Sequence, residues 1–173
     1  RGSAKAPDEQ FCFVRLLEDD AVLVVGKAAG VLSHAAGPGA GIAVSDHLLP
    51  SERPVHRLDR ETSGVLLLAR SSEAAAALGN ALQRGQMEKR YVALVQGVAH
   101  NKGIIRRSLL CDGQERKAIT RFRRVAVLRL GGWRGSLLLV RPETGRQHQI
   151  RRHLAGLGHP VLGDARYGDR RAN

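Results

Sequence analysis

The stretch RPVHRLDRETSGVLLLAR, residues 53–70, sets one aspartate, Asp59, among several cations. These cations are Arg53, His56, Arg57 and Arg60. A carboxylate can act as a covalent nucleophile, and neighbouring guanidinium groups favour its charged form. The Thr-Ser-Gly sequence that follows can form a hydrogen-bonded turn that fixes the side chain. A solvated ion-pair cluster is the alternative, and spacing alone favours it, because clustered charges usually lie in solvent.

A second dense stretch, ETGRQHQIRRHLAGLGHPVLGDARYG, covers residues 143–168. Its spacing predicts a helix that Thr144 caps and that ends near residues 156–158. The buried stripe of this helix is expected to be Ile150, Leu154 and Leu157. At about 100° per residue, Arg151 lies at the border of that stripe. Because a partly buried arginine is costly without a carboxylate, we expect an acidic partner for Arg151.

Other chemistries are weaker interpretations of the sequence. The spacings of His56, His148, His153 and His159 fit no zinc pattern, and neither Cys12 nor Cys111 lies close in sequence. A triad of Ser63, His148 and Asp164 can be drawn, but no nucleophile elbow accompanies it. The glycine-rich residues 37–41 lack the Gly-Lys-Ser/Thr ending of a phosphate loop. No metal site is therefore expected.

The elements that must position these residues follow from hydrophobic alternation and turn residues. Strands are expected at residues 21–27, 64–70, 88–97, 103–110, 117–130 and 135–143. Helices are expected at residues 42–49 and 71–85, the latter with a serine N-cap and Gly85 as its stop. This order indicates an α+β fold whose central mixed, mostly antiparallel sheet is flanked by few helices.

The net charge of the chain indicates which class of partner it can bind. Lys and Arg total 28 and Asp and Glu total 16, so the net charge is +12. A domain this basic needs a polyanionic partner, and nucleic acid is the default. Aromatic residues are only 3% of the chain, so we expect binding through phosphates and shape. No apolar run approaches the ~20 residues that span a bilayer, so no membrane partner is expected.

Four blocks in order resemble the RluA-type family of RNA pseudouridine synthases. They are VVGKAAGVLSH (24–34), HRLDRETSGVLLLA (56–69), KRYVALVQG (89–97) and ETGRQHQIRRHLAGLGHPVLGDARYG (143–168). One departure is Ala28, where the family usually has proline. Members isomerise uridine to pseudouridine by breaking the N-glycosidic bond, turning the base and rejoining it through C5. The resemblance implies the pseudouridine synthase catalytic fold and an isomerase of rRNA or tRNA without a cofactor.

The resemblance also assigns roles to residues. Asp59 matches the essential aspartate, which attacks ribose C1′ or uracil C6. Tyr91 matches the tyrosine that packs on the target base and assists proton removal from C5. Arg151 matches the basic residue that pairs with the catalytic aspartate, and Ile150 helps to wall the pocket. Arg57 matches the residue that enters the RNA helix where the flipped base leaves. The further RNA-binding assignments are His56, Arg60, Arg146 and His148.

The resemblance runs from about Glu18 to Gly168. Residues 1–10 are expected to be a disordered tip or a tag remnant, and residues 11–173 a single catalytic domain, although the length also allows two small lobes. We expect part of the C-terminal region to be missing and no S4-type RNA-binding module to precede the domain. A monomer in the cytoplasm is expected, or in an organelle if the source is a eukaryote.

Two alternatives stay open. A non-catalytic RNA-binding protein on the same fold would use its charge alone and would need no buried acid. A glycoside hydrolase or nucleosidase would need a second carboxylate about 5–10 Å from Asp59. Asp164 and Glu143 are the candidates for that carboxylate. The net charge favours RNA over a neutral sugar.

Overall fold

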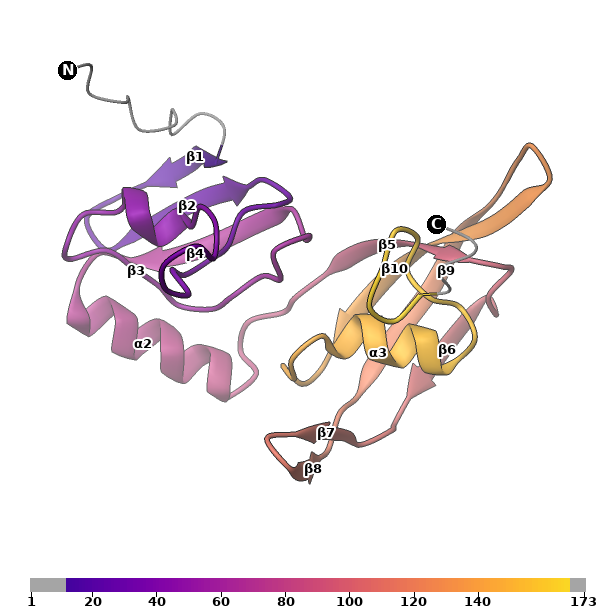
Figure 1. The fold of residues 1–173 in the computed structure, drawn as a ribbon. Helices are drawn as coiled ribbons and strands as arrows, with labels where there is room; N and C mark the ends of the chain where they lie inside the picture. The colour runs from indigo at the N-terminus through magenta and orange to yellow at the C-terminus, as the bar shows by residue number, and fades with distance from the viewer. Residues whose placement is uncertain (1–11, 169–173) are drawn as a thin grey trace, which may run out of the picture. The chain divides into compact units, whose positions relative to one another are not determined.

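The computed structural model describes residues 12–168, so the expectation for residues 1–10 lies outside the described residues. Contacts divide the chain into two compact units, residues 1–86 (unit 1) and 87–173 (unit 2). Within the described residues, each unit has a four-stranded antiparallel sheet and one α-helix (Figure 1). The predicted α+β class is confirmed. The assignment of residues 11–173 to one catalytic domain stays a prediction.

The sheet of unit 1 has the strand order β1-β2-β4-β3. Its strands are β1 (Phe13–Glu18), β2 (Val22–Lys27), β3 (Arg53–Pro54) and β4 (Gly64–Ala69). β2 alternates strictly, so that Leu23, Val25 and Lys27 all lie on its buried face. The first two belong to the hydrophobic core of the unit, whereas Lys27 carries a charge into it.

The two helical predictions for unit 1 had different outcomes. α2 (Ser72–Gln83) packs against β4, and the Ser71 hydroxyl accepts the Ala74 N–H at 3.1 Å, which confirms the serine cap. The helix expected at residues 42–49 is wrong: only the 3₁₀ turn η1 (Val44–His47) forms. Residues 42 and 43 are extended instead, because the Ile42 carbonyl accepts the Leu32 N–H at 3.0 Å.

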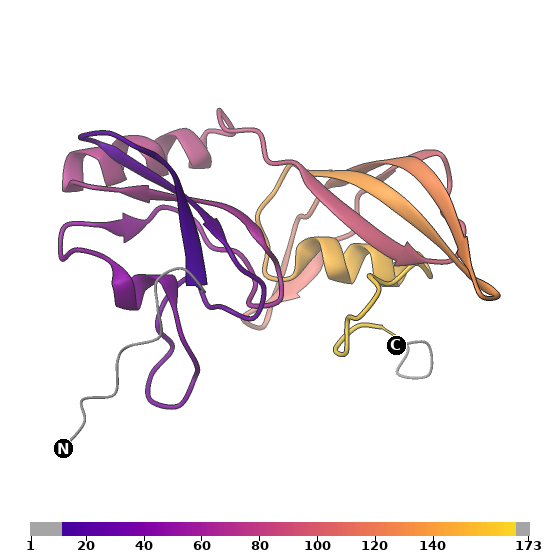
Figure 2. The ribbon, with the colours of Figure 1, turned by 90° about the horizontal axis from the view of Figure 1, so that it is seen from above.

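The sheet of unit 2 has the order β5-β10-β9-β6. Its strands are β5 (Tyr91–Gln96), β6 (Lys102–Ile105), β9 (Thr120–Leu130) and β10 (Trp133–Pro142). The strand expected at 103–110 is two strands, β6 and β7 (Leu109–Cys111), and β7 forms a separate hairpin with β8 (Gln114–Arg116). α3 (Gln149–Gly156) lies along one face of the four-stranded sheet (Figure 2).

α3 begins later than the sequence predicts. Thr144 is not its cap, because the Thr144 hydroxyl accepts the Ile119 N–H at 3.0 Å and donates to Gln149 Oε1 at 2.7 Å. The N-cap is His148, which adopts left-handed backbone angles (φ 51°). Of the predicted stripe, Leu154 is buried and Ile150 packs beside the core, but Leu157 is 44% exposed because it lies just past the end of the helix.

The β9–β10 hairpin is the longest element of unit 2, and it projects past the rest of that unit in both ribbon views (Figures 1 and 2). Gly131 and Gly132 form its turn with positive φ values of 53° and 84°, the conformation of a two-residue hairpin turn whose twist matches the strands. The register of the two strands shifts by one residue opposite Leu137 and Leu138. The sequence pattern did not predict this bulge.

Candidate active site

Asp59 lies in unit 1, in the segment between β3 and β4, and both of its sequence neighbours are held by hydrogen bonds. The buried Ser33 hydroxyl accepts the Leu58 N–H at 3.0 Å and donates to the Leu58 carbonyl at 3.0 Å. The Arg60 carbonyl accepts the Gly30 N–H at 2.8 Å. The backbone on either side of Asp59 is therefore fixed from the Gly30–Ser33 loop.

Lys27 supplies the strongest of these restraints. It is 2% exposed, and its ammonium donates to the carbonyls of Ala28 (2.8 Å), Val31 (2.6 Å) and Arg60 (3.2 Å). Burial lowers the pKa of Lys27, while the negative charges of Glu61 and Asp59 oppose that shift. A buried ammonium thus satisfies three carbonyls at the Asp59 turn and attracts the Asp59 carboxylate.

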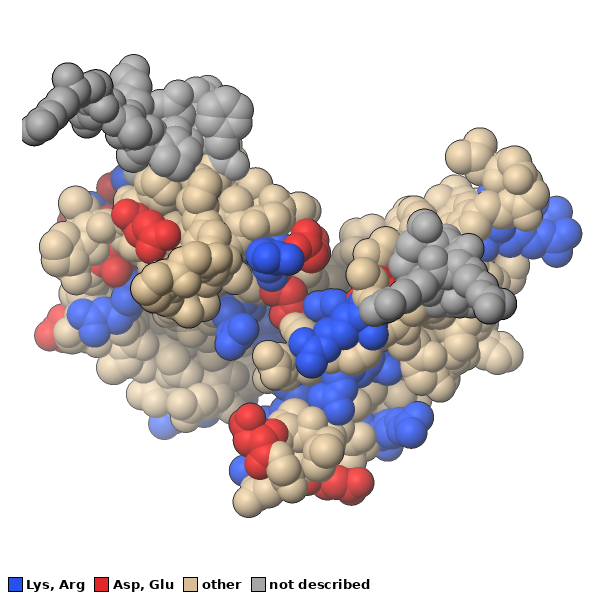
Figure 3. Space-filling model, viewed as in Figure 1, with Lys and Arg blue, Asp and Glu red and all other residues tan. Residues whose placement is uncertain are grey.

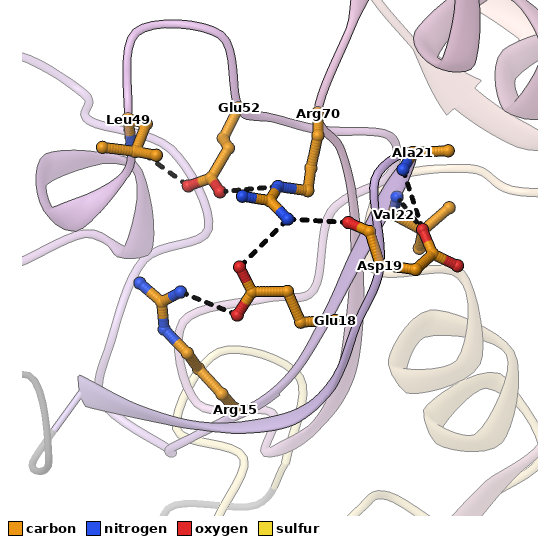
Figure 4. Close-up of polar contacts among 8 residues, drawn as sticks. All are labelled: Arg15, Glu18, Asp19, Ala21, Val22, Leu49, Glu52 and Arg70. Carbon is orange, nitrogen blue, oxygen red and sulfur yellow. Dashed lines mark hydrogen bonds and ion pairs between the residues drawn. The ribbon is translucent and has the colours of Figure 1, made fainter.

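Arg70, the residue after β4, forms ion pairs that stabilise the turn before β3 (Figure 4). Arg70 Nε lies 3.2 Å from Oε1 of the buried Glu52 side chain, and Arg70 Nη1 lies 3.0 Å from Glu18 Oε1. The other Glu52 carboxylate oxygen accepts the Leu49 N–H at 3.1 Å. This network ties the turn before β3 to the ends of β1 and β4.

His56 has a structural contact that its sequence position did not indicate. Its Nε2 accepts the Leu67 N–H at 3.2 Å, so the ring is held against β4 through this nitrogen. The assignment of His56 to RNA binding stays a prediction. By contrast Arg57 and Arg60 are exposed, and Arg60 forms an ion pair with Glu61 at 2.8 Å.

The turn after Asp59 forms as the Thr-Ser-Gly sequence suggested. The Thr62 N–H donates to the Asp59 carbonyl at 3.0 Å, and Gly64, with φ 138°, opens β4. A side chain at Gly64 would be strained in that conformation. Asp59 is half-buried, so it has access to solvent while its backbone is fixed.

In unit 2, Arg151 has the acidic partner that the sequence predicted for it. Its Nε and Nη2 donate to Asp164 Oδ2 and Oδ1, both at 2.8 Å, and the Asp164 side chain is 2% exposed. Asp164 Oδ1 also accepts the N–H groups of Arg166 and Tyr167. The hydrogen bonds from Arg151 lower the pKa of Asp164 despite its burial.

This finding refines two predictions from the sequence. The resemblance paired Arg151 with Asp59, which lies in the other unit, and that pairing stays a prediction. Asp164, a candidate in the triad and glycosidase interpretations, holds Arg151 in a bidentate contact. The Arg151 guanidinium also lies over the Tyr167 ring, 5.1 Å from its centroid.

The other predicted residues of unit 2 lie around α3 and the edge of its sheet. Tyr91 begins β5 and, like Ile150, packs at the margin of the core cluster. His148 Nδ1 is 2.9 Å from the Tyr167 hydroxyl. Arg146 is exposed and donates to the Lys117 carbonyl at 3.2 Å.

Sequence reasoning missed Gln149, which is 4% exposed. Its Oε1 accepts the Arg146 N–H and the Thr144 hydroxyl, and its Nε2 donates to the Ile119 carbonyl and the Thr120 hydroxyl. Gln149 therefore closes the loop before α3. No alternation signal marks such a residue, because two of its four partners, Ile119 and Thr120, lie about thirty positions away.

Across residues 12–168, no group of three or more His, Cys, Asp or Glu side chains can hold a metal ion. No helix in the described part is long and apolar enough to cross a membrane.

Comparison with known families identifies the class to which the chain belongs. The family model described as RNA pseudouridylate synthase matches residues 21–156. The chain therefore belongs to the RNA pseudouridylate synthase family, an isomerase family, and the resemblance stated from sequence is confirmed. The match includes Asp59, Tyr91 and Arg151.

Relatives and a solved structure agree with that membership. "tRNA pseudouridine synthase C" of Pectobacterium carotovorum is 41% identical over 69% of this chain and 37% of its own length. The protein of the same name from Haemophilus ducreyi is 34% identical over 91% of this chain and 75% of its length. "Ribosomal large subunit pseudouridine synthase D" of Zymomonas mobilis is 32% identical over 88% of this chain and 55% of its own length. The structure of human RNA pseudouridylate synthase domain containing 1 superposes with a TM-score of 0.82 at 25% identity, covering 97% of this chain and 74% of that one.

Proposed function

We propose that this chain converts uridine to pseudouridine in RNA, with transfer RNA as its substrate. The family match carries this proposal, because it spans both the fixed Asp59 segment and the Arg151 helix. Transfer RNA is favoured over ribosomal RNA because the relatives with the higher identities, 41% and 34%, are named for tRNA. A monomer that acts in the cytoplasm is part of the proposal.

Asp59 is the proposed nucleophile. Its carboxylate attacks ribose C1′ or uracil C6, the N-glycosidic bond breaks and the base turns. C5 then bonds to C1′, the bond to Asp59 breaks and frees the carboxylate, C5 loses its proton and N1 gains one. The restraints from Lys27 and Ser33 support this role, because a nucleophile reacts fastest when its position is fixed before the substrate arrives. The positive charge of Lys27 also attracts the Asp59 carboxylate.

Residues of unit 2 and the exposed arginines complete the proposal. Arg151 pairs with the nucleophile, Tyr91 packs on the target base, and Ile150 walls the pocket. Arg57 enters the RNA helix in place of the flipped base, which offsets the loss of stacking. Further contacts with the RNA come from His56, Arg60, Arg146 and His148.

Release of tritium from RNA labelled at uridine C5 tests the proposal, because pseudouridine formation removes that atom. We expect Asp59→Asn to abolish release while RNA affinity stays within about twofold, since only the nucleophile is lost. Asp112→Asn is the matched control, because Asp112 is exposed and its left-handed backbone (φ 49°) suits asparagine.

The same assay separates the enzyme from a non-catalytic RNA-binding protein on this fold. A wild-type chain that binds RNA and releases no tritium would be such a binder. Turnover that persists in Asp59→Asn would instead remove Asp59 from the mechanism and leave the family assignment intact. Comparing labelled tRNA with labelled ribosomal RNA fragments then decides between the two substrate classes.

A further inference from the structure

The outer part of the β9–β10 hairpin is left without neighbouring strands. β6 pairs with β9 only over Thr120–Arg123, and β5 pairs with β10 only from Val140 to Gly135. The last flanking backbone contacts are the Arg124 N–H to the Asn101 carbonyl and the Gly97 N–H to the Arg134 carbonyl. Residues 125–134 thus form a two-stranded projection, the arm.

The pairing register of β9 and β10 decides which side chains share a face of the arm. Leu138 is opposite Arg124, but Leu137 is opposite Ala126, so Val125 is the extra residue. Beyond the bulge, Arg129 is opposite Arg134. By the alternation of β10, Arg134 shares a face with Ser136, Leu138 and Val140, and Leu138 belongs to the core cluster that includes Leu154 of α3. Both arginines therefore leave the arm on the α3 side of the sheet.

The opposite face of the arm is apolar. Leu128 and Leu130 are 39% and 79% exposed. The Trp133 ring covers Gly135 so closely that a Cβ there would clash with the ring. The arm is thus amphipathic, with both of its cations on one face.

The arm has a like-charge pair and no acid to neutralise it. From Arg116 to Pro142 the sequence holds seven arginines, one lysine and no acidic residue. Among the described residues, neither Arg129 nor Arg134 has an ion-pair or hydrogen-bond partner for its side chain. Blue atoms flank the projecting hairpin in Figure 3, and no red atoms lie beside them. Like charges directly opposite on a β-ladder destabilise it, so an anion between these guanidinium groups would be stabilising.

We propose that Arg129 and Arg134 together bind the phosphate backbone of the RNA substrate. The inference rests on the proposed function for the identity of the polyanion. Two guanidinium forks side by side suit phosphate oxygens, and double-stranded RNA is recognised mainly through its backbone and shape. Arg134 lies about 13 Å along β10 from Leu138, which packs with α3. The contact is therefore with RNA several nucleotides away from whatever nucleotide meets the α3 region.

The test compares the double variant Arg129→Ala/Arg134→Ala with Arg15→Ala/Arg84→Ala, which removes the same charge from exposed positions of unit 1. The probe is an unmodified tRNA transcript, and its dissociation constant is measured at several salt concentrations. In the arm variant we expect binding about tenfold weaker than in the control. The slope of the logarithm of the binding constant against the logarithm of the salt concentration should be smaller in magnitude by roughly 1.5–2, the value for two lost phosphate contacts. The loss appears in KM rather than kcat, and the melting temperature stays equal or rises, because the like-charge pair is gone.

Binding by the arm variant that matches the control would overturn the inference. So would a lowered melting temperature with a parallel loss of binding, because the arginines would then be structural. Tritium release by the wild-type chain keeps this test separate from the proposed function. If the wild type releases none while the arm variant still loses affinity, the arm is an RNA contact on a protein that is not an isomerase.

Discussion

At the scale of single residues, the contact between Asp164 and Arg151 is the clearest finding in the candidate site. The sequence predicted that Arg151 needs an acid, because the helix periodicity put it at the border of a buried stripe. The same periodicity says nothing about which acid, because Asp164 follows α3 in an irregular segment. The structure shows a bidentate pair, and its geometry orients the guanidinium group of Arg151.

Replacing Asp164 with Asn should destabilise the fold by about 2–3 kcal/mol, because Arg151 would lose its buried carboxylate. The effect should depend on pH. The pKa of Asp164 is lowered in the folded chain, so its stabilisation is complete above the unfolded value of about 4. It is lost as the pH falls below about 4 and through the lower pKa of the folded chain.

Urea unfolding of wild type and Asp164→Asn across that pH range checks this prediction. The gap between their unfolding free energies should close toward low pH. A gap that is the same at pH 7 and pH 3 would mean that the carboxylate charge does not carry the effect. Asp112→Asn should show no gap at either pH.

At the scale of elements, local signals explain what was predicted well. β2, β4 and α2 form where alternation, glycine and a serine cap indicated them, because those signals need only neighbours in sequence. Lys27 was missed although the signal was present: strict alternation from Leu23 and Val25 puts it on the buried face. Its carbonyl partners come from a loop and from Arg60, which pattern reasoning does not place.

Replacing Lys27 with Met keeps the volume and removes the donor. Because the carbonyls of Ala28, Val31 and Arg60 would lose their shared ammonium, we expect a loss of about 3 kcal/mol of stability. Denaturant unfolding measures this loss, and tritium release at a temperature where the variant stays folded should fall as well. Lys102→Met, at an exposed lysine, is the control. An unfolding midpoint equal to that control would contradict the role of Lys27.

At the scale of the whole molecule, the predicted site residues divide between the two units. Asp59, Arg57, His56 and Arg60 belong to unit 1, and Tyr91, Arg151, Ile150, Arg146 and His148 belong to unit 2. Each cluster is fixed by contacts within its own unit. Sequence separation alone could not show this division, because the only link between the clusters was the family resemblance.

The net charge of +12 makes a prediction for the whole chain. RNA affinity should fall about a hundredfold between 50 and 200 mM salt, the decrease expected for roughly four phosphate contacts. Filter binding of a tRNA transcript across that range measures the slope. An affinity that hardly changes would show that the basic surface does not contact the RNA backbone.

The bulge at Val125 has an evolutionary consequence. Because the extra residue is unpaired, deleting its codon would make β9 regular and leave the pairs on both sides unchanged, including Arg129 opposite Arg134. A three-nucleotide deletion could thus change the bend and twist of the hairpin and leave Asp59 and Arg151 untouched. Lineages with this fold would have a one-step route to redirecting the arm that requires no change in their chemistry.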